Sequence, residues 1–261
     1  MTHQKRESLY FGKLAVTCEN SGNLFACQQL ANRLAIPCYQ VVNADIAEAF
    51  VLTWRNGALK LVDREFPKQE GLAVDIQPRP GEQRSYPAPK KGPLALALGR
   101  KTQTIIDATT GWAQDSLHMF RMGFDVLCIE RSPVMRELIQ DGFNRLSQLD
   151  WVQNLQLRSP QLLAGNAIDL LPSFEQKPDC IYLDPMFPAK RKKSALSKKS
   201  MRVLRDLLGD DEDRTQLFET AMKTAGKRVV VKSPDYAEPI GGKPNESIHG
   251  KLLRYDIYLT H

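Results

Sequence analysis

The sequence contains no apolar run that approaches the roughly 20 residues of a membrane-spanning helix, which disfavours a helical membrane protein. Its first residues, Met1 to Glu7, lack the apolar core of a signal peptide. The five cysteines include no Cys-x-x-Cys pair, and the four histidines form no metal-like cluster. We therefore expect a cytoplasmic protein with reduced thiols and with no zinc or other metal site.

The chain also lacks the Gly-x-Gly-x-x-Gly loop with which dinucleotide-binding proteins hold a pyrophosphate. The segment from Asp107 to Asp115, where a strand meets a helix, contains the single glycine Gly111. A nicotinamide-dependent oxidoreductase is therefore disfavoured. A ligand without phosphates needs no such cradle, and one glycine is enough for it to approach the backbone closely.

What is present is the composition of an ordinary globular protein, with 42% hydrophobic and 25% charged residues among 261. This length allows one large domain, or one domain with a small appendage. The net charge of +6 is modest, but basic residues cluster between Met186 and Arg205 without an intervening acid. Such a run is usually a solvated surface, yet this one directly follows a candidate pocket and suits contacts with phosphates.

Residues 1–76 predict a small α+β N-terminal lobe. Residues 14–18 are typical of a short strand, and residues 23–35 have helical spacing. Two strand-like runs, residues 49–54 and 58–62, flank Arg55-Asn56-Gly57, and an Asn-Gly pair in this position predicts a hairpin. Residues 77–93 are rich in proline and glycine, which predicts a linker or an irregular arm around the next domain.

Residues 94–261 alternate between strand and helix patterns, which predicts an α/β domain with a doubly wound, mostly parallel sheet. The expected strands are residues 104–109, 124–130, 155–158, 179–184 and 228–232, with a last strand within 251–260. The expected helices are residues 115–122, 133–146 and 215–225, and residues 168–171 form a turn or a helix.

Acidic residues follow the predicted strands, at the edge where α/β sheets bind ligands. Glu130 ends one strand about 20 residues after Gly111, where an acid can accept hydrogen bonds from both ribose hydroxyls of a nucleoside. It can equally be acidic because strand ends reach solvent. Asp107 can equally cap the following turn, and Asp115 can equally be there because a helix N-terminus favours an acid.

The run Asp184-Pro185-Met186-Phe187-Pro188 follows the apolar strand before it. The carboxylate of Asp184 and the carbonyl of Pro185 offer acceptors for the N–H groups of an exocyclic amine, and Phe187 offers a flat face to a planar base. The alternative is an ordinary turn with a buried phenylalanine. The segment from Lys232 to Tyr236 lies beyond another strand at the same edge, either as a second wall of the pocket or as a capped loop.

In this order, Asp107-x-x-x-Gly111, Glu130 and Asp184-Pro185-x-Phe187 resemble the class I, Rossmann-like methyltransferases that use S-adenosylmethionine (SAM). The last of these resembles their D/N-P-P-Y/F signature for amine methylation, with Met186 at the second proline. A fuller pattern, over about residues 100–260, resembles the bacterial small-subunit (16S) ribosomal RNA guanine-N2 methyltransferases of the RsmJ type. The matching pieces are residues 107–111, 129–131, 181–188, 192–196, 198–203, 228–236 and 256–258.

The resemblance implies transfer of a methyl group from SAM to the N2 amine of a guanosine in 16S ribosomal RNA. It implies Asp184, Pro185 and Phe187 as catalytic residues, ribosomal RNA or the small subunit as partner, and no membrane or obligate protein partner. The residues expected at the cofactor are Asp107, Gly111, Gln114, Asp115, Glu130, Arg131, Asn166, Ala167 and Asp184. Those expected at the RNA are Lys190, Arg191, Lys192, Lys193, Lys198, Lys199 and Lys232.

Other functions stay open at this point. They are an amine methyltransferase for a DNA base, another RNA or a protein glutamine, and a non-catalytic RNA-binding module on a methyltransferase scaffold. The basic run favours nucleic acid over a protein side chain. A module without catalysis is expected to lose the strand-end acids, and this chain has Asp107, Glu130 and Asp184.

Overall fold

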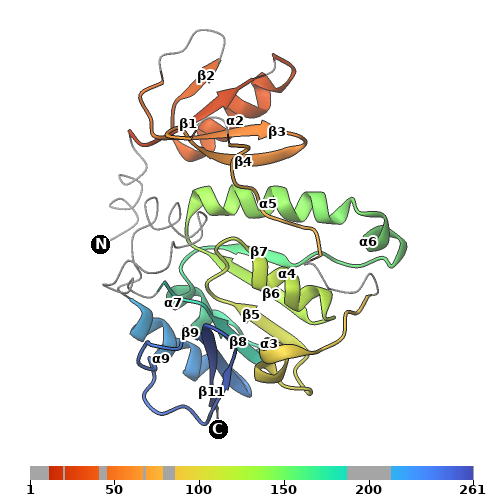
Figure 1. Cartoon of the computed structure of the whole chain (residues 1–261), viewed down its shortest axis with the longest axis vertical. Helices are drawn as coiled ribbons and strands as arrows, with labels where there is room; N and C mark the ends of the chain where they lie inside the picture. The colour runs from red at the N-terminus through yellow and green to blue at the C-terminus, as the bar shows by residue number, and fades with distance from the viewer. Residues whose placement is uncertain are drawn as a thin grey trace.

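The computed structural model describes residues 12–19, 21–40, 46–66, 69–78, 86–186 and 213–260, which form a four-stranded and a seven-stranded sheet (Figure 1). The smaller sheet has the order β2-β1-β3-β4 and is joined by the short helix η1 and the helix α2. Its elements are β1 (Leu14–Cys18), η1 (Ser21–Asn23), α2 (Leu24–Leu34), β2 (Cys38–Gln40), β3 (Phe50–Arg55) and β4 (Ala58–Asp63). The predicted strand, helix and hairpin of this region are therefore confirmed, whereas β2 was not predicted.

The β3–β4 hairpin forms where the Asn-Gly pair predicts it. Asn56 and Gly57 have φ values of 51° and 73°, the positive values that a two-residue type I′ turn requires at both central positions. Arg55 pairs with Ala58 directly across this turn, so the turn sets the register of the whole ladder. Phe50, Leu52, Leu59 and Leu61 consequently face the main core, whereas Val51 and Val62 pack in a small cluster on the opposite face of the sheet.

The larger sheet has the order β10-β11-β9-β8-β5-β6-β7. Its strands are β5 (Thr104–Asp107), β6 (Asp125–Glu130), β7 (Gln161–Ala164), β8 (Cys180–Leu183), β9 (Arg228–Pro234), β10 (Glu246–His249) and β11 (Leu253–Leu259). The first five pair in parallel, and β11 is antiparallel to both of its neighbours. This confirms the doubly wound, mostly parallel sheet, and the chain changes direction across the sheet between β5 and β8.

Helices cover both faces of the larger sheet (Figure 1). They are α3 (Gly92–Leu98), α4 (Gln114–Arg121), α5 (Pro133–Ser147), α6 (Asp150–Asn154), α7 (Ala167–Leu170), η2 (Leu171–Ser173) and α9 (Arg214–Thr224). Residues of α3, α4 and α5 share one buried apolar cluster, and residues of α7, η2 and α9 contribute to a second on the other face. Alternating strands and helices therefore build the three layers that the sequence predicts.

Helix α5 lies between the two sheets (Figure 1). The apolar cluster on its side of the larger sheet contains Leu138 and Ile139 of α5 together with Leu14 and Leu52 of the smaller sheet. The two sheets thus share one continuous core through this helix. The predicted limits of the N-terminal lobe at residues 1–76 and of the linker at 77–93 stay predictions.

The described parts of the proline-rich segment pack against α4. The N–H of Ala88 donates to the carbonyl of Arg121 at 2.7 Å, and the guanidinium of Arg121 donates back to the carbonyl of Ile76. The Tyr86 ring centroid lies 5.9 Å from that of Phe120, in an aromatic cluster. These contacts are those of an arm that follows the surface of the larger domain.

The expected strand at residues 155–158 is wrong, and the third parallel strand is β7. Leu155 instead caps the end of α6, and Gln156 has a φ of 52°, which is incompatible with an extended strand. Proline at position 160 then precedes the strand, as proline commonly does because it cannot donate to a ladder. Helix α3 was missed because Gly92 and Pro93 looked like linker, although proline suits the first turn of a helix.

The polar strand β10 was also missed, since Glu246 and Ser247 interrupt any apolar alternation. It nevertheless forms because its backbone pairs with β11 along its whole length. In the part of the chain that the structure describes, no helix is both long and apolar enough to cross a membrane.

Candidate active site

The carboxyl ends of β5 and β8 meet at the point where the strand order reverses, which is where open α/β sheets bind ligands. The backbone N–H of Asp184, directly after β8, donates to Oγ1 of Thr109 in the loop after β5 at 2.6 Å. Asp107 pairs with Tyr182 in the ladder just below this bond. The loop after β5 is therefore tied to the first residue of the predicted catalytic turn.

Glu130, at the end of β6, holds the glycine loop in place. One carboxylate oxygen accepts the N–H of Gly111 at 3.0 Å, and the other accepts the N–H of Ser132 at 2.8 Å. Gly111 has a φ of 52°, and a Cβ built on it would meet only the carbonyl of Thr109, at 3.8 Å. A ligand can consequently approach this backbone beside the carboxylate of Glu130.

Asp107 lies beneath this surface and is buried, with 2% of its area exposed. Its carboxylate accepts the N–H of Thr109 at 3.1 Å and the hydroxyl of Ser116 on α4. Burial raises its pKa from 3.8 to about 7, and the hydrogen bonds offset only part of that effect. These contacts fit the interpretation of Asp107 as a support of the turn, and its contact with the cofactor stays a prediction.

Lys232, near the end of β9, joins two of the predicted acids. Its Nζ lies 2.6 Å from Oδ2 of Asp115 on α4 and 2.7 Å from Oδ2 of Asp184. The hydroxyl of Tyr182, from β8, donates to the same oxygen of Asp115 at 2.8 Å. Burial alone would lower the pKa of Lys232, but the charges of Asp184 and Asp115 raise it above its ordinary value.

The other predicted cofactor residues lie along the same edge. Arg131 forms a two-oxygen ion pair with Asp213, at 3.1 and 2.8 Å, which ties the end of β6 to the start of α9. The Oδ1 of Asn166 accepts the N–H of Ile168 at 3.1 Å and caps α7, of which Ala167 is the first residue. Gln114 is the exposed first residue of α4. Their contacts with a cofactor stay predictions.

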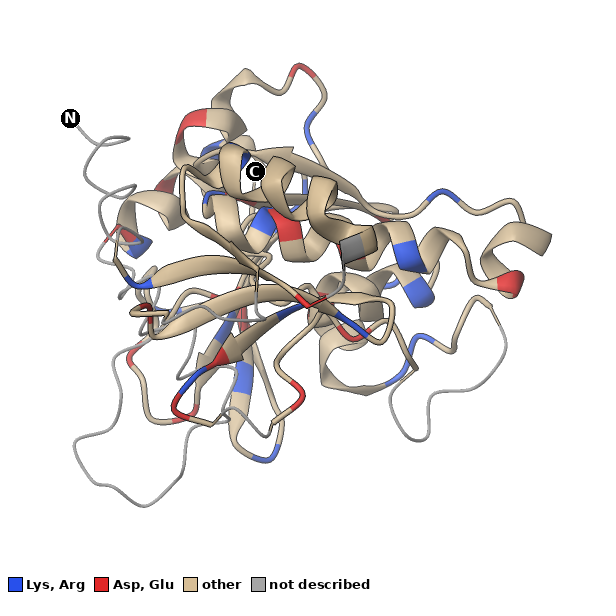
Figure 2. Ribbon diagram, turned by 90° about the horizontal axis from the view of Figure 1, so that it is seen from above, with Lys and Arg blue, Asp and Glu red and all other residues tan. Residues whose placement is uncertain are grey.

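Pro185 follows Asp184 as a buried residue, and the partly buried Met186 packs against the larger apolar cluster. Phe187 and the basic residues from Lys190 to Arg205 lie outside the described residues. Over the ribbon that is described, basic and acidic residues are interspersed (Figure 2). The stacking role of Phe187 and the phosphate contacts of the basic run therefore stay predictions.

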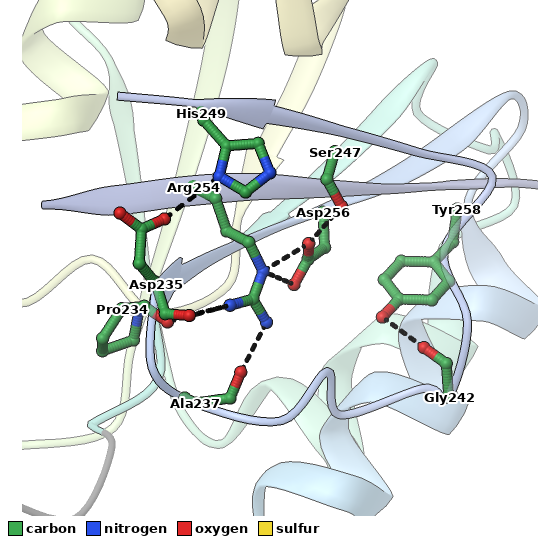
Figure 3. A network of polar contacts seen from close by, with 9 residues as sticks. All are labelled: Pro234, Asp235, Ala237, Gly242, Ser247, His249, Arg254, Asp256 and Tyr258. Atoms are coloured by element: carbon green, nitrogen blue, oxygen red, sulfur yellow. Dashed lines mark hydrogen bonds and ion pairs between the residues drawn. The ribbon is translucent and has the colours of Figure 1, made fainter. Parts of the chain in front are cut away.

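Beyond Lys232, the loop after β9 is fixed by one buried guanidinium (Figure 3). Arg254 donates to the carbonyls of Pro234 and Asp235, both at 3.0 Å, and to that of Ala237 at 2.6 Å. Its Nε donates to both carboxylate oxygens of Asp256, at 2.8 and 3.1 Å. This is the capped loop that the sequence left open as an alternative, and its use as a second wall for a base stays a prediction.

Comparison with known proteins identifies the class of protein that has this fold and site. Residues 36–260 match the model of a family described as "Putative SAM-dependent methyltransferase". The crystal structure of a SAM-dependent methyltransferase from Neisseria gonorrhoeae aligns with a TM-score of 0.66 over 95% of this chain and 97% of that one. At 24% identity this second likeness concerns the fold alone. The family match and the strand-end site together define the class as SAM-dependent methyltransferases.

Curated relatives narrow the class. A protein of Shewanella amazonensis named ribosomal RNA small subunit methyltransferase J is 39% identical over 220 residues, 80% of this chain and 86% of the relative. A protein of the same name from Coxiella burnetii is 34% identical over 251 residues, 94% of this chain and 96% of the relative. The chain belongs to the ribosomal RNA small subunit methyltransferase J family.

Proposed function

We propose that this protein transfers a methyl group from SAM to the exocyclic N2 amine of a guanosine in 16S ribosomal RNA, and that it does so in the cytoplasm. The observation that carries the proposal is the position of Asp184. This residue lies where the strand order of the sheet reverses. Its backbone N–H donates to Oγ1 of Thr109, and its carboxylate accepts a hydrogen bond from the ammonium of Lys232. The name shared by the relatives supports ribosomal RNA as the substrate.

The residues present fit a nucleoside cofactor with a positive charge. Glu130 places a carboxylate beside the glycine loop, Gly111 leaves room above its backbone, and Asp115 and Asp184 supply negative charge. SAM supplies an electrophilic methyl group when it is bound there. In this arrangement the residues after β5 and β6 would hold the cofactor, and the turn after β8 would hold the amine that accepts its methyl group.

The turn after β8 would act on the guanine amine by orientation and electrostatics. The amine is a poor nucleophile because its lone pair is delocalised into the ring. Hydrogen bonds from its N–H groups to the carboxylate of Asp184 and the carbonyl of Pro185 would turn that lone pair toward the methyl group. In the balanced reaction the amine nitrogen would bond to the methyl carbon as the C–S bond breaks, S-adenosylhomocysteine would be the leaving group, and the surplus N–H proton would pass to solvent water.

Two sequence predictions complete this proposal outside the described residues. Phe187 would stack on the base, a contact worth about 1–3 kcal/mol in comparable nucleic-acid complexes. The basic run from Lys190 to Arg205 would contact phosphates, and each such contact with single-stranded RNA steepens the dependence of log affinity on log salt by about 0.7.

The test is Asp184→Ala, compared with wild type in a transfer assay with labelled SAM and small ribosomal subunits. We expect transfer to fall below detection in this variant, because the amine loses its principal acceptor, while the circular dichroism spectrum stays native. The matched control is Asp125→Ala, which makes the same change at the exposed amino end of β6. It should transfer at the wild-type rate. Near-native turnover of Asp184→Ala would remove this carboxylate from the reaction.

A further inference from the structure

We propose that Lys232 is a positioning residue of the active site, which holds the carboxylates of Asp115 and Asp184 together in their ionised forms, and that it does not bind an RNA phosphate. The proposal rests on the proposed function. It replaces the role that the sequence predicts for this lysine. The observation behind it is the ammonium shared between the two acids, at 2.6 and 2.7 Å.

The network joins three elements that are distant in sequence. Asp115 comes from the first turn of α4, Asp184 from the turn after β8, and Lys232 from β9. Asp115 is one of the residues expected at the cofactor, and Asp184 is expected both at the cofactor and at the amine. Lys232 is therefore the direct link between the acid on the donor side and the acid on the acceptor side.

The backbone that carries Lys232 is fixed on both sides. Lys232 pairs with Tyr255 of β11, and the preceding Val231 pairs with Leu183 of β8. Two residues further on, the carbonyl of Pro234 accepts a hydrogen bond from the buried Arg254 (Figure 3). The side chain is 21% exposed and two of its three N–H groups are directed at carboxylates, which leaves little of the ammonium for a phosphate.

The other charged groups around Asp184 indicate how the ammonium of Lys232 affects ionisation at this site. Asp115 faces it from α4 and Asp107 lies below it on β5, so these carboxylates oppose one another's ionisation. Tyr182 contributes only a neutral hydroxyl, because burial and the nearby acids raise its pKa well above the ordinary value. The ammonium of Lys232 contacts both acids, and its positive charge favours their ionised forms.

The experiment compares Lys232→Met with Lys232→Arg and with the control Lys251→Met. Lys251 is an exposed lysine at the same edge of the sheet, two residues before β11, so the control removes the same charge there. Three quantities are measured: kcat against pH, SAM affinity against pH by calorimetry, and the salt dependence of RNA affinity.

For Lys232→Met we expect kcat to fall at least tenfold at pH 7 and its acid limb to move to higher pH by about one unit or more, the usual effect of removing a close opposite charge. The salt dependence of RNA affinity should stay that of wild type. Lys232→Arg should bring the acid limb back toward the wild-type position, because it restores the charge. Lys251→Met should leave the acid limb unchanged.

Two results would overturn the proposal. If the acid limb of Lys232→Met coincides with that of wild type while the salt slope becomes shallower by about 0.7, the lysine is a phosphate contact and the proposal is overturned. An acid limb that Lys232→Arg fails to restore in a folded protein also contradicts it. SAM affinity is measured without RNA, so its pH dependence tests Lys232 even if wild type fails to methylate ribosomal RNA and the proposed function fails.

Discussion

At the scale of single residues, Asp107 shows how the site is supported from below. Its pKa is raised to about 7, first by burial and then by the charges of Asp115 and Asp184, against hydrogen bonds from Ser116 and Thr109 that lower it. The folded protein therefore binds this proton more tightly than the unfolded chain does. The contribution of Asp107 to stability is fully present below about pH 4 and is lost as the pH rises toward 7.

This predicts the behaviour of Asp107→Asn, whose amide does not titrate but can still hydrogen-bond with Ser116 and Thr109. Relative to this variant, the wild-type free energy of unfolding should decrease by roughly 2–3 kcal/mol between pH 5 and pH 8, because about two units of the pKa shift lie between pH 5 and the folded-state pKa of about 7. Urea unfolding of both proteins at the two pH values measures the difference. Equal pH dependence in the two proteins would show that Asp107 ionises as easily in the fold as in the unfolded chain.

Residue patterns in the sequence predict the strand-end acids but not their partners. Glu130 and Asp184 follow apolar runs, so their place at the ligand edge of a parallel sheet follows from the alternation of strands and helices. The ion pair between Asp115 and Lys232 joins positions 117 apart. It depends on β9 lying beside β8 and on the first turn of α4 reaching the same edge of the sheet, which no local pattern specifies. A lysine directly after the run of valines in β9 was the one available signal.

At the scale of elements, α5 packs between the two sheets, and its residue Gly142 allows a close contact there. A Cβ built on Gly142 would lie 2.6 Å from Cγ1 of Val74, in the segment that leads away from the smaller sheet. Because this distance is shorter than van der Waals contact, a Cβ at this position would force the segment with Val74 to shift. The absence of a side chain at Gly142 thus lets the segment with Val74 pack directly on α5.

We therefore expect Gly142→Ala to lower the free energy of unfolding by about 1–3 kcal/mol through overpacking. In an unobstructed helix the same change would raise it by up to about 1 kcal/mol. A double-mutant cycle with Val74→Ala tests the cause, because the smaller residue makes room for the new methyl group. The account predicts a positive coupling in urea unfolding, and strictly additive effects would mean that Val74 is not the obstacle.

Local sequence patterns predicted the elements whose turn or cap residues are characteristic. They failed for elements that depend on pairing with another strand or on the conformation of a single residue. The β3–β4 hairpin follows from Asn56 and Gly57, and α5 begins at Pro133 with Ser132 as its cap. Strand β10 has no such signal and exists because β11 offers it a partner. The alternation of Leu155 and Leu157 resembled a strand, but the left-handed Gln156 between them turns the chain.

At the scale of the whole molecule, the residues that the proposed reaction would use lie along one edge of the larger sheet. In the proposed reaction, the turns after β5 and β6 would hold the donor, and the turn after β8 would supply acceptors for the amine. The net charge of +6 is small, so long-range attraction of RNA by the whole protein is weak. Affinity for RNA is therefore expected to come from local basic residues, above all the run that follows Phe187.

The most direct test of this account is to identify the methylated nucleoside. Wild-type protein is incubated with labelled SAM and small ribosomal subunits from cells that lack the gene, and the RNA is digested to nucleosides. The account predicts label in N2-methylguanosine of 16S ribosomal RNA, and none with Asp184→Ala. Label in another nucleoside or in ribosomal protein, or no label with folded wild-type protein that binds SAM, would contradict it.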